Sequence, residues 1–320
     1  MTRAVAAVSL AEVHAAQGRL AGVAERTPVV RCQADTGGEV FLKLENLQPI
    51  GSFKIRPVGN AVLVRETAGL AAGLYTCSSG NSAVAVAWLA RRLGVAATAV
   101  VTDAAPEAKL ARLRALGARI RQVPFDTWWQ AVAVCALEGE TGSYVDAVRD
   151  PAALAGDGTL GVEILEQLPD VEAIFTPFGG GALACGIACA VRALNPKVKV
   201  IACELESAQP FAAALRAGHV VSTESRPGFV SGVGFHTLLP EMWPLCRDMI
   251  DGVLTVTLAE VAAAIRLMAA GNKVIAEGAG AVPVAAALSG RHPYRRVCAV
   301  VSGGNLGNEA LMRILAGGIP

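Results

Sequence analysis

Hydrophobic and polar positions alternate in two patterns along most of the chain. Short continuous apolar runs predict buried strands, and each is followed by a longer stretch with apolar residues every three or four positions, which predicts a helix. The first run of predicted elements is strand 74–78, helix 81–94, strand 94–102, helix 105–117, strand 118–123 and helix 126–140. The second run is helix 158–168, strand 172–178, helix 181–194, strand 197–203 and, last, strand 295–302.

Strands that alternate with helices of this length indicate parallel sheets. We therefore expect an α/β protein with two lobes, each a mostly parallel sheet with helices on both faces. The absence of a sharp boundary favours a smaller domain at 73–147, inserted into a larger domain formed by 1–72 and 148–320. DTGGEV at 35–40 predicts a hairpin turn between two early strands.

The composition is that of a globular protein with a large core. Of the 320 residues, 53% are hydrophobic and 17% are charged, with a formal net charge of +1, which gives no electrostatic footprint for nucleic acid. The mean hydropathy of +0.47 raises the question of a membrane protein. Apolar runs such as 279–289 are too short and too rich in Gly and Pro to span a bilayer. Ser9 and Glu12 form a capping box rather than part of a signal peptide, so we expect a cytoplasmic protein.

The cysteines give no sign of a disulfide framework or a metal site. The eight positions are 32, 77, 135, 185, 189, 203, 246 and 298. They form no CxxC pattern and have no neighbouring His at ligand spacing, and most lie in apolar segments. We expect buried, reduced thiols.

Four polar or glycine-rich turns fall where predicted strands end or helices begin. They are GSFK at 51–54, SSGNS at 78–82, FGGGAL at 178–183 and SGGN at 302–305. Open parallel sheets bind ligands at the carboxyl ends of their strands. Taken singly, each turn has a simpler explanation as a tight turn or a helix cap.

The FGGGAL turn predicts an anion site. Gly179, Gly180 and Gly181 lead directly from a strand into a helix, so their backbone amides point along the helix axis, and a phosphate is the expected ligand. With Ala184 the turn also satisfies G-x-G-x-x-A, and Glu204 ends the next strand, so a dinucleotide site is an alternative.

Lys54 lies between Phe53 and Ile55, neighbours that a solvated lysine seldom has. It could be a core-edge residue, a phosphate clamp or a nucleophilic amine. The hydroxyls and amide of the SSGNS turn suit a substrate carboxylate at a positive helix end. The hydroxyl of Ser302 could meet a ring nitrogen.

Together and in this order, the four turns resemble those of the fold-type II pyridoxal-phosphate enzymes, in the tryptophan synthase beta-like superfamily. The similarity is to the serine/threonine dehydratase and serine racemase group, and it extends from about Arg26 to Asn308. The motifs that carry it are KLENLQPIGSFKIR, TCSSGNSAVAVAWLARRLG, GDGTLGVEIL, FGGGALACGI and VVSGGN.

The resemblance implies pyridoxal 5'-phosphate as the cofactor. The residues implied to bind it are Lys54, Phe53, Asn81, Gly179, Gly180, Gly181, Ala182 and Ser302. Lys54 would hold the cofactor as a Schiff base and move the Cα proton, Phe53 would pack on the ring, and Asn81 would bind its 3′-oxygen. The glycines and Ala182 would hold the phosphate, and Ser302 would meet the ring nitrogen.

The substrate residues implied by the resemblance all lie in the SSGNS turn. Ser78 and Asn81, with Ser82 at the position after them, would form the carboxylate pocket of a small amino-acid substrate. Ser79 would lie on the ring face opposite Lys54, where racemases of the group place a second proton carrier. We therefore expect two candidate catalytic residues, Lys54 and Ser79.

The expected activity is that of an ammonia-lyase, or dehydratase, which removes water from L-threonine or L-serine to give a 2-keto acid and ammonia. An amino-acid racemase or epimerase and a β-replacement enzyme are alternatives within the group. A nicotinamide oxidoreductase is the alternative from another class. The resemblance implies a homodimer, which is usual in the group. We expect no nucleic-acid or membrane partner.

The sequence departs from the group's pattern around the substrate. Ser82 stands where the group usually has His, and Pro57 follows Arg56 where it usually has Gly. Pro210 replaces an acidic residue, which leaves Glu204 as a weak case for a metal, and we expect none. Trp128 and Trp129 are expected in the core of the small domain, with the wall of a bulky-substrate pocket as the alternative.

Overall fold

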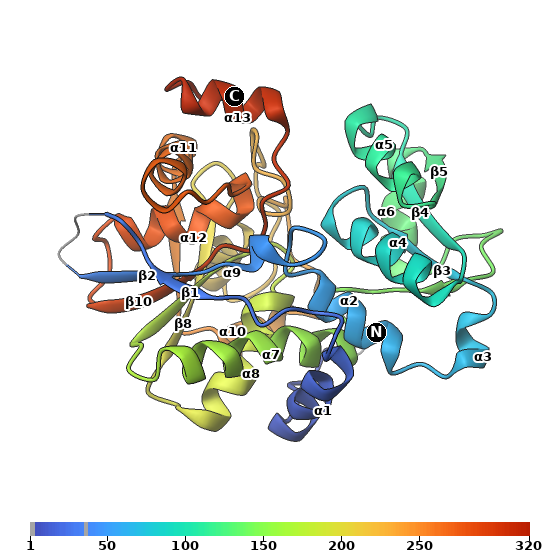
Figure 1. The fold of residues 1–320 in the computed structure, drawn as a ribbon, viewed down its shortest axis with the longest axis horizontal. Helices are drawn as coiled ribbons and strands as arrows, with labels where there is room; N and C mark the ends of the chain where they lie inside the picture. Colours follow the sequence, from blue (N-terminus) through green and yellow to red (C-terminus); the bar gives the residue numbers. More distant parts are fainter. Residues whose placement is uncertain (1–3, 35–37) are drawn as a thin grey trace.

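The computed structural model describes residues 4–34 and 38–320. Figure 1 shows two lobes side by side: a large lobe around a six-stranded sheet, on the left, and a small lobe around a four-stranded sheet, on the right. Within the described ranges, no helix is both long and apolar enough to cross a membrane. The expected α/β fold with mostly parallel sheets is confirmed.

The large lobe is built on a sheet with the strand order β1-β2-β10-β7-β8-β9. The strands are β1 (Val29–Arg31), β2 (Glu39–Lys43), β7 (Ala173–Pro177), β8 (Lys199–Leu205), β9 (Gly252–Val256) and β10 (Arg296–Val300). Every neighbouring pair is parallel except β1 and β2. The early hairpin pairing is therefore present, whereas 35–37 of its turn lie outside the described residues.

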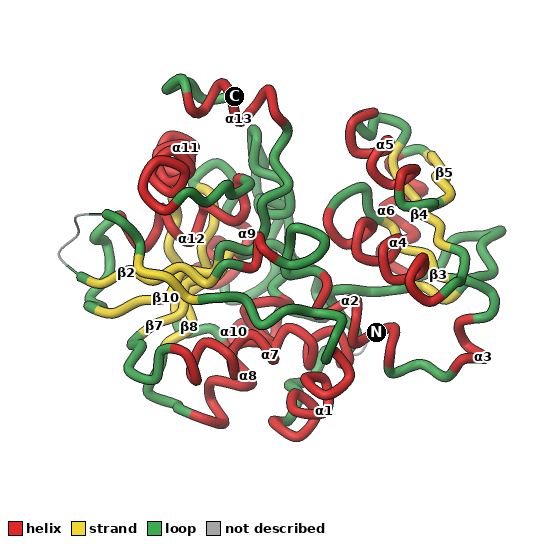
Figure 2. Tube along the Cα trace, viewed as in Figure 1, coloured by secondary structure: helices red, strands yellow, loops and turns green. Residues whose placement is uncertain are grey.

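Helices cover both faces of this sheet, as Figure 2 shows in red around the yellow strands. On one face lie α1 (Leu10–Leu20), α7 (Pro151–Gln167), α8 (Ala182–Leu194), α9 (Pro210–Ala217) and α10 (Trp243–Met249). On the other lie α11 (Leu258–Leu267), η2 (Met268–Asn272), α12 (Gly278–Leu288) and α13 (Asn308–Leu315). Strand β10 shows the strand period of two, because Cys298 and Val300 join the first core and Val297 and Ala299 the second.

The small lobe is an entirely parallel sheet in the order β5-β4-β3-β6. Its elements are β3 (Leu74–Cys77), α4 (Asn81–Leu93), β4 (Ala97–Thr102), α5 (Glu107–Ala115), β5 (Arg119–Val123), α6 (Phe125–Val134) and β6 (Ser143–Tyr144). The side chains of α4 and α5 pack on one face, and α6 packs on the other.

The connection from the large lobe to the small lobe begins with η1 (Glu45–Leu47), α2 (Ile55–Leu63) and α3 (Thr67–Leu70). Helix α2 lies between the lobes: Ile55, Val58 and Val62 belong to the small-lobe core, whereas its first turn packs closely on α7. A Cβ at Gly156 would overlap the carbonyl of Arg56, so α7 must have glycine at this crossing. Lys54 is the residue directly before α2 and is therefore held where the lobes meet.

Two predicted helices differ from the observed ones. Helix α7 begins at Pro151, with Asp150 as its N-cap, rather than at residue 158. Helix α6 ends at Val134 rather than near Glu140. The cause of the early end is tertiary: Arg149 donates to the carbonyl oxygens of Val132 and Ala133, the groups that a longer helix would have used itself.

Candidate active site

The GSFK and SGGN turns lie against each other through backbone hydrogen bonds. The amide of Phe53 donates to the carbonyl of Ser302, and the amide of Gly304 donates to the carbonyl of Gly51, both at 2.9 Å. Gly51 has φ +72°, and a Cβ there would lie 2.6 Å from Oδ1 of Asn305. Glycine is therefore required where the two turns meet.

Asn81 joins the SSGNS turn to this pair. Its Nδ2 donates to Oε1 of Glu277, and its Oδ1 accepts from Nδ2 of Asn305, each at 2.7 Å. Nδ2 of Asn305 also donates to the carbonyl of Ile50 at 3.0 Å. The structure thus brings three of the four turns together, with Asn81 from the small lobe and its partners from the large lobe.

Lys54 is half-buried beside these turns. Its Nζ lies 4.7 Å from the ring centroid of Phe53, a cation–π distance. Burial lowers the pKa of Lys54, and the charges of Asp157 and Asp146 act in the opposite direction. An amine with a lowered pKa holds less charge near neutral pH and is a better nucleophile.

The FGGGAL turn has the backbone expected of an anion site. Gly181 has φ +87° and precedes the 13-residue helix α8. A Cβ at Gly179 would overlap the carbonyl oxygen of Gly232, and one at Gly180 would lie 2.9 Å from Cγ1 of Val148. The turn therefore keeps its amides bare at a helix N-terminus, where backbone N–H groups favour a phosphate.

The serines of the SSGNS turn surround the start of α4. The hydroxyl of Ser78 accepts from the amide of Gly80 at 3.1 Å, and Ser79 and Ser82 are half-buried. Gly80 is the N-cap of α4, and no side chain caps the helix. The simpler explanation of this turn as a side-chain cap is therefore wrong. The serine hydroxyls lie at the positive end of a 13-residue helix.

Two acidic residues at the site were missed from the sequence, Glu277 and Asp157. Burial raises the pKa of Glu277 to about 7, although the Asn81 amide acts in the opposite direction. Asp157 is fully buried, and its pKa is also raised to about 7 by burial. The only local signal for Glu277 was its position before a glycine-rich helix, and Asp157 lay in a quoted motif with no role assigned.

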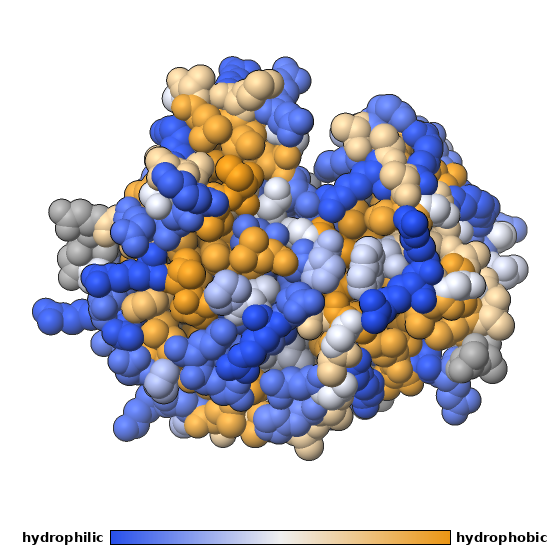
Figure 3. Space-filling view, viewed as in Figure 1, coloured by the Kyte–Doolittle hydropathy of each residue, from blue (hydrophilic) through white to orange (hydrophobic). Residues whose placement is uncertain are grey.

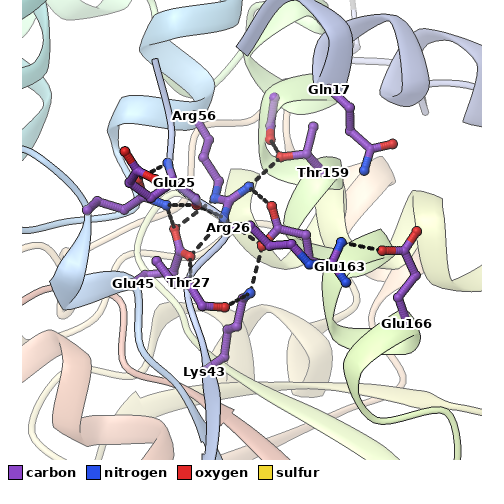
Figure 4. A network of polar contacts seen from close by, with 12 residues as sticks. Gln17, Glu25, Arg26, Thr27, Lys43, Glu45, Arg56, Thr159, Glu163 and Glu166 are labelled. Carbon is purple, nitrogen blue, oxygen red and sulfur yellow. Dashed lines mark hydrogen bonds and ion pairs between the residues drawn. The ribbon is translucent and has the colours of Figure 1, made fainter. Parts of the chain in front are cut away.

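Arg56 belongs to a buried ionic network that fixes the first turn of α2 (Figure 4). Its Nε lies 2.8 Å from Oε2 of Glu45, and its Nη1 lies 2.7 Å from Oε1 of Glu163. Nζ of Lys43 lies 2.6 Å from Oε2 of Glu163. The network links η1, β2, α2 and α7, so it holds the backbone two residues after Lys54 in a single position.

Glu204 and the cysteines have structural roles. The carboxylate of Glu204 accepts the amides of Phe211 and Ala212, both at 2.9 Å, and so caps α9. Across residues 4–34 and 38–320, no group of His, Cys, Asp and Glu side chains could hold a metal. All eight cysteines are free, and each except Cys135 is buried, which confirms the expected thiols.

The two tryptophans of α6 differ in their surroundings. Trp128 is partly buried against the small-lobe core, in agreement with its expected place there, and its Nε1 donates to the carbonyl of Val100 at 3.2 Å. Trp129 instead reaches the large lobe, where its ring centroid lies 5.4 Å from that of His236. On the face drawn in Figure 3 the surface is hollowed between the lobes.

Comparison with known proteins identifies the family. The sequence matches the model described as pyridoxal-phosphate dependent enzyme over residues 20–303. It is 36% identical over 319 residues to an L-threonine ammonia-lyase of Thermotoga maritima. The matched region covers 98% of this chain and 79% of that protein. The chain therefore belongs to the pyridoxal-phosphate-dependent enzymes.

Solved structures agree with this assignment. Maize serine racemase has a TM-score of 0.89 at 29% identity, covering 98% of both chains. A threonine deaminase from T.th. has a TM-score of 0.82 at 33% identity, covering 94% of this chain and 99% of that one. The resemblance to fold-type II enzymes is confirmed, and the dinucleotide alternative is wrong.

The residues present fit the cofactor that the family uses. The bare amides at 179–181 suit its phosphate, because side chains would fill the space that those glycines leave. Lys54 supplies an amine with a lowered pKa. The Asn81 amide has one N–H engaged by Glu277, which leaves a second N–H for another acceptor.

Proposed function

We propose that the protein is a pyridoxal-phosphate-dependent ammonia-lyase that eliminates water from a β-hydroxy amino acid. L-threonine and L-serine are the proposed substrates, and a 2-keto acid and ammonia are the products. The observation that carries this proposal is the meeting of the GSFK, SSGNS and SGGN turns beside Lys54. The ammonia-lyase relative from Thermotoga maritima supports the same reaction.

In this proposal five contacts would hold the cofactor. Lys54 binds it covalently, Phe53 packs on its ring, and the turn from Gly179 to Ala182 holds its phosphate. Asn81 would bind the 3′-oxygen, and the hydroxyl of Ser302, which is buried, would meet the ring nitrogen. The contacts that fix Asn81 on both sides support its role, because an amide with a set orientation loses little freedom on binding.

The substrate carboxylate is proposed to bind at the start of α4. Ser78, Asn81 and Ser82 offer hydroxyl and amide donors there, and the backbone amides of the first turn add to them. The helix dipole favours the negative charge of the carboxylate at this end. The Cα–H bond of the substrate would then be held next to the amine of Lys54.

The chain's own groups carry out the proton transfers. The bound cofactor supplies the electron sink for the pair released when the Cα–H bond breaks. Nζ of Lys54 takes that proton and returns one to the departing β-hydroxyl, which leaves as water. The hydroxyl of Ser302 would offer the ring nitrogen a neutral hydrogen-bond partner, with no negative charge beside it. A second water then hydrolyses the unsaturated amine product to the keto acid and ammonia.

The direct test is product formation by the full-length protein loaded with pyridoxal phosphate. L-threonine, L-serine and bulkier β-hydroxy amino acids are supplied separately, and keto acid and ammonia are measured together. Equal amounts of the two products from at least one substrate would support the proposal. Release of no ammonia from any of them would contradict it.

Racemisation is a second candidate function, favoured by the position of Ser79 two residues before Asn81 and by the maize serine racemase structure. A racemase needs a proton carrier on each face of the substrate, and Ser79 is the candidate opposite Lys54. Deuterium from solvent should then enter both enantiomers, and Ser79→Ala should abolish inversion while sparing elimination. Equal loss of both activities would reject the two-carrier hypothesis.

We also propose that residues 73–147 form a domain that closes over the substrate, in a cytoplasmic homodimer. The Asn81 contacts to the large lobe support closure at the site.

The proposals of a cytoplasmic location and of a homodimer have separate support. Eight free cysteines are typical of a reducing compartment. The exposed apolar side chains of Met312, Leu315 and Ile319 near the C-terminus support association with a second copy. Light scattering at several concentrations tests the dimer, and a mass of one chain throughout would contradict it.

A further inference from the structure

Asp157 is an acidic residue whose burial has no structural explanation in the core. Its side chain is fully buried in α7, and neither carboxylate oxygen has a hydrogen-bond partner among the described residues. Burying a carboxyl group without hydrogen bonds is costly, and native proteins rarely do so without a functional reason. The cost points to an electrostatic role.

Close packing of helices fixes the position of Asp157. A Cβ at Gly186 of α8 would lie 2.6 Å from Cβ of Asp157, so the two helices approach each other at this residue as only glycine allows. A Cβ at the adjacent Gly158 would lie 2.7 Å from a methyl group of Val13 in α1. The Cβ of Asp157 is therefore held where α7 and α8 cross.

Few charged or titratable groups act on Asp157. From η1 and α2 these are Glu45, Arg56 and Lys54, and from α8 the thiol of Cys185. The Arg56 guanidinium is already engaged by Glu45 and by a second carboxylate, and α1 contributes an apolar methyl group. Lys54 is the remaining cation.

Lys54, like Asp157, lacks a hydrogen-bond or ion-pair partner for its charged group among the described residues. Nζ of Lys54 makes no hydrogen bond or ion pair with any residue in the described part of the chain, and its contact is with the Phe53 ring. Burial lowers the pKa of Lys54 and raises that of Asp157, and each charge offsets the effect of burial on the other. Asp146 also acts on Lys54, but its carboxylate is already paired with Arg149 at 2.7 Å. The half-buried Lys54 and the fully buried Asp157 are therefore opposite charges without an ion pair of their own among the described residues.

We propose that the Asp157 carboxylate is the counter-charge of the Lys54 ammonium. It acts as a positioning residue and exchanges no proton: the Cα–H bond of the substrate breaks, the N–H bond forms at Nζ, and Asp157 stabilises the cation that results. Without this counter-charge, burial would leave the amine too weak a base for Cα. The inference rests on the proposed role of Lys54 and adds the residue that sets its basicity.

The test compares Asp157→Asn with the wild type by titrating Lys54 in the cofactor-stripped, full-length chain. Competitive acylation across a pH series, read by mass spectrometry at Lys54, gives its pKa without any turnover. Loss of an opposite charge should lower the pKa of Lys54 by about one unit or more. The acid limb of kcat/KM in the loaded enzyme should move to lower pH by a similar amount.

Glu204→Gln is the matched control. Glu204 is also fully buried and its pKa is also raised to about 7, but its carboxylate caps α9. Its substitution should leave the Lys54 titration unchanged. An unchanged Lys54 pKa in Asp157→Asn, or an equal shift in both variants, would overturn the proposal.

A reciprocal titration covers the case in which Asp157→Asn does not fold. In Lys54→Met, carbon-13 spectra of labelled aspartate should give Asp157 a higher pKa than in the wild type, because linkage between two charges is mutual. An unchanged Asp157 pKa would reject the pairing. Neither titration needs catalysis, so an inactive dehydratase assay and a failed pairing are separate results.

Discussion

The side chains of Asn81 and Glu277 are hydrogen-bonded at 2.7 Å although 196 residues separate them in sequence. Asn81 is the first residue of α4 in the small lobe, and Glu277 is the N-cap of α12 in the large lobe. Asn305 holds the other end of the same amide at 2.7 Å. The orientation of one side chain and the approach of the two lobes are therefore set by the same contacts.

Replacing Glu277 with Gln should stabilise the cofactor-free protein at alkaline pH. The folded-state pKa of Glu277 is raised from 4.5 to about 7, so the folded state holds the proton more tightly than the unfolded state. The free energy of unfolding of the wild type should thus fall by roughly 3 kcal/mol as pH rises from about 4.5 to 7. In Glu277→Gln this pH-dependent fall should be absent, because Gln does not titrate.

Urea unfolding at pH 5 and pH 8 measures this difference. Glu277→Gln should become more stable relative to the wild type at pH 8 than at pH 5. The exposed Glu138 provides the control, since Glu138→Gln should show the same difference from the wild type at both pH values. A Glu277→Gln effect on stability that does not change with pH would contradict the raised pKa of Glu277.

Gly181→Ala should weaken cofactor binding and destabilise the fold. The new methyl group would overlap Sγ of Cys246, and φ +87° is strained for alanine, which together should cost about 1–3 kcal/mol or more. Gly94→Ala isolates the strain, because Gly94 has φ +70° with nothing within 4 Å of its Cβ position. Cofactor affinity, measured by absorbance titration, should fall for Gly181→Ala alone; equal affinities would exclude a phosphate site at this turn.

Arg56→Ala should be among the most destabilising single changes in the chain. It leaves the buried carboxylates of Glu45 and Glu163 without their main partner, a loss of about 3–5 kcal/mol. Arg26→Ala breaks an ion pair to Glu166 in which both side chains are about half exposed, and should cost less than about 1 kcal/mol. Chemical unfolding of both variants gives the comparison, and similar losses would show that the network does not support α2.

The sequence predicted those parts of the site that local signals mark. Glycine clusters and polar turns at strand ends identified the turns around Lys54, Gly179 and Ser302, because backbone conformation and helix ends leave signatures within a few residues. Glu277 and Asp157 were missed for the opposite reason. Each is a single acidic residue in an apolar helix region, and its partners come from segments far away in the chain.

The ends of helices show the same difference between features set by local sequence and features set by distant segments. The capping box of Ser9 and Glu12 was predicted and is present, since both of its hydrogen bonds are local. The end of α6 was placed too late, because Cys135 adopts a left-handed conformation with φ 54° where glycine would have been the usual signal. Arg149 completes that end from another segment, and no local pattern predicts its contribution.

Covalent attachment of the cofactor to Lys54 is the central claim, and borohydride reduction of the loaded protein followed by peptide mass spectrometry tests it most directly. The account predicts a reduced pyridoxyl adduct on Lys54, and none in Lys54→Ala, whose elimination rate should fall by about 10²–10⁴-fold or more. An unmodified Lys54 in a protein that binds pyridoxal phosphate, or an adduct on another lysine, would contradict it.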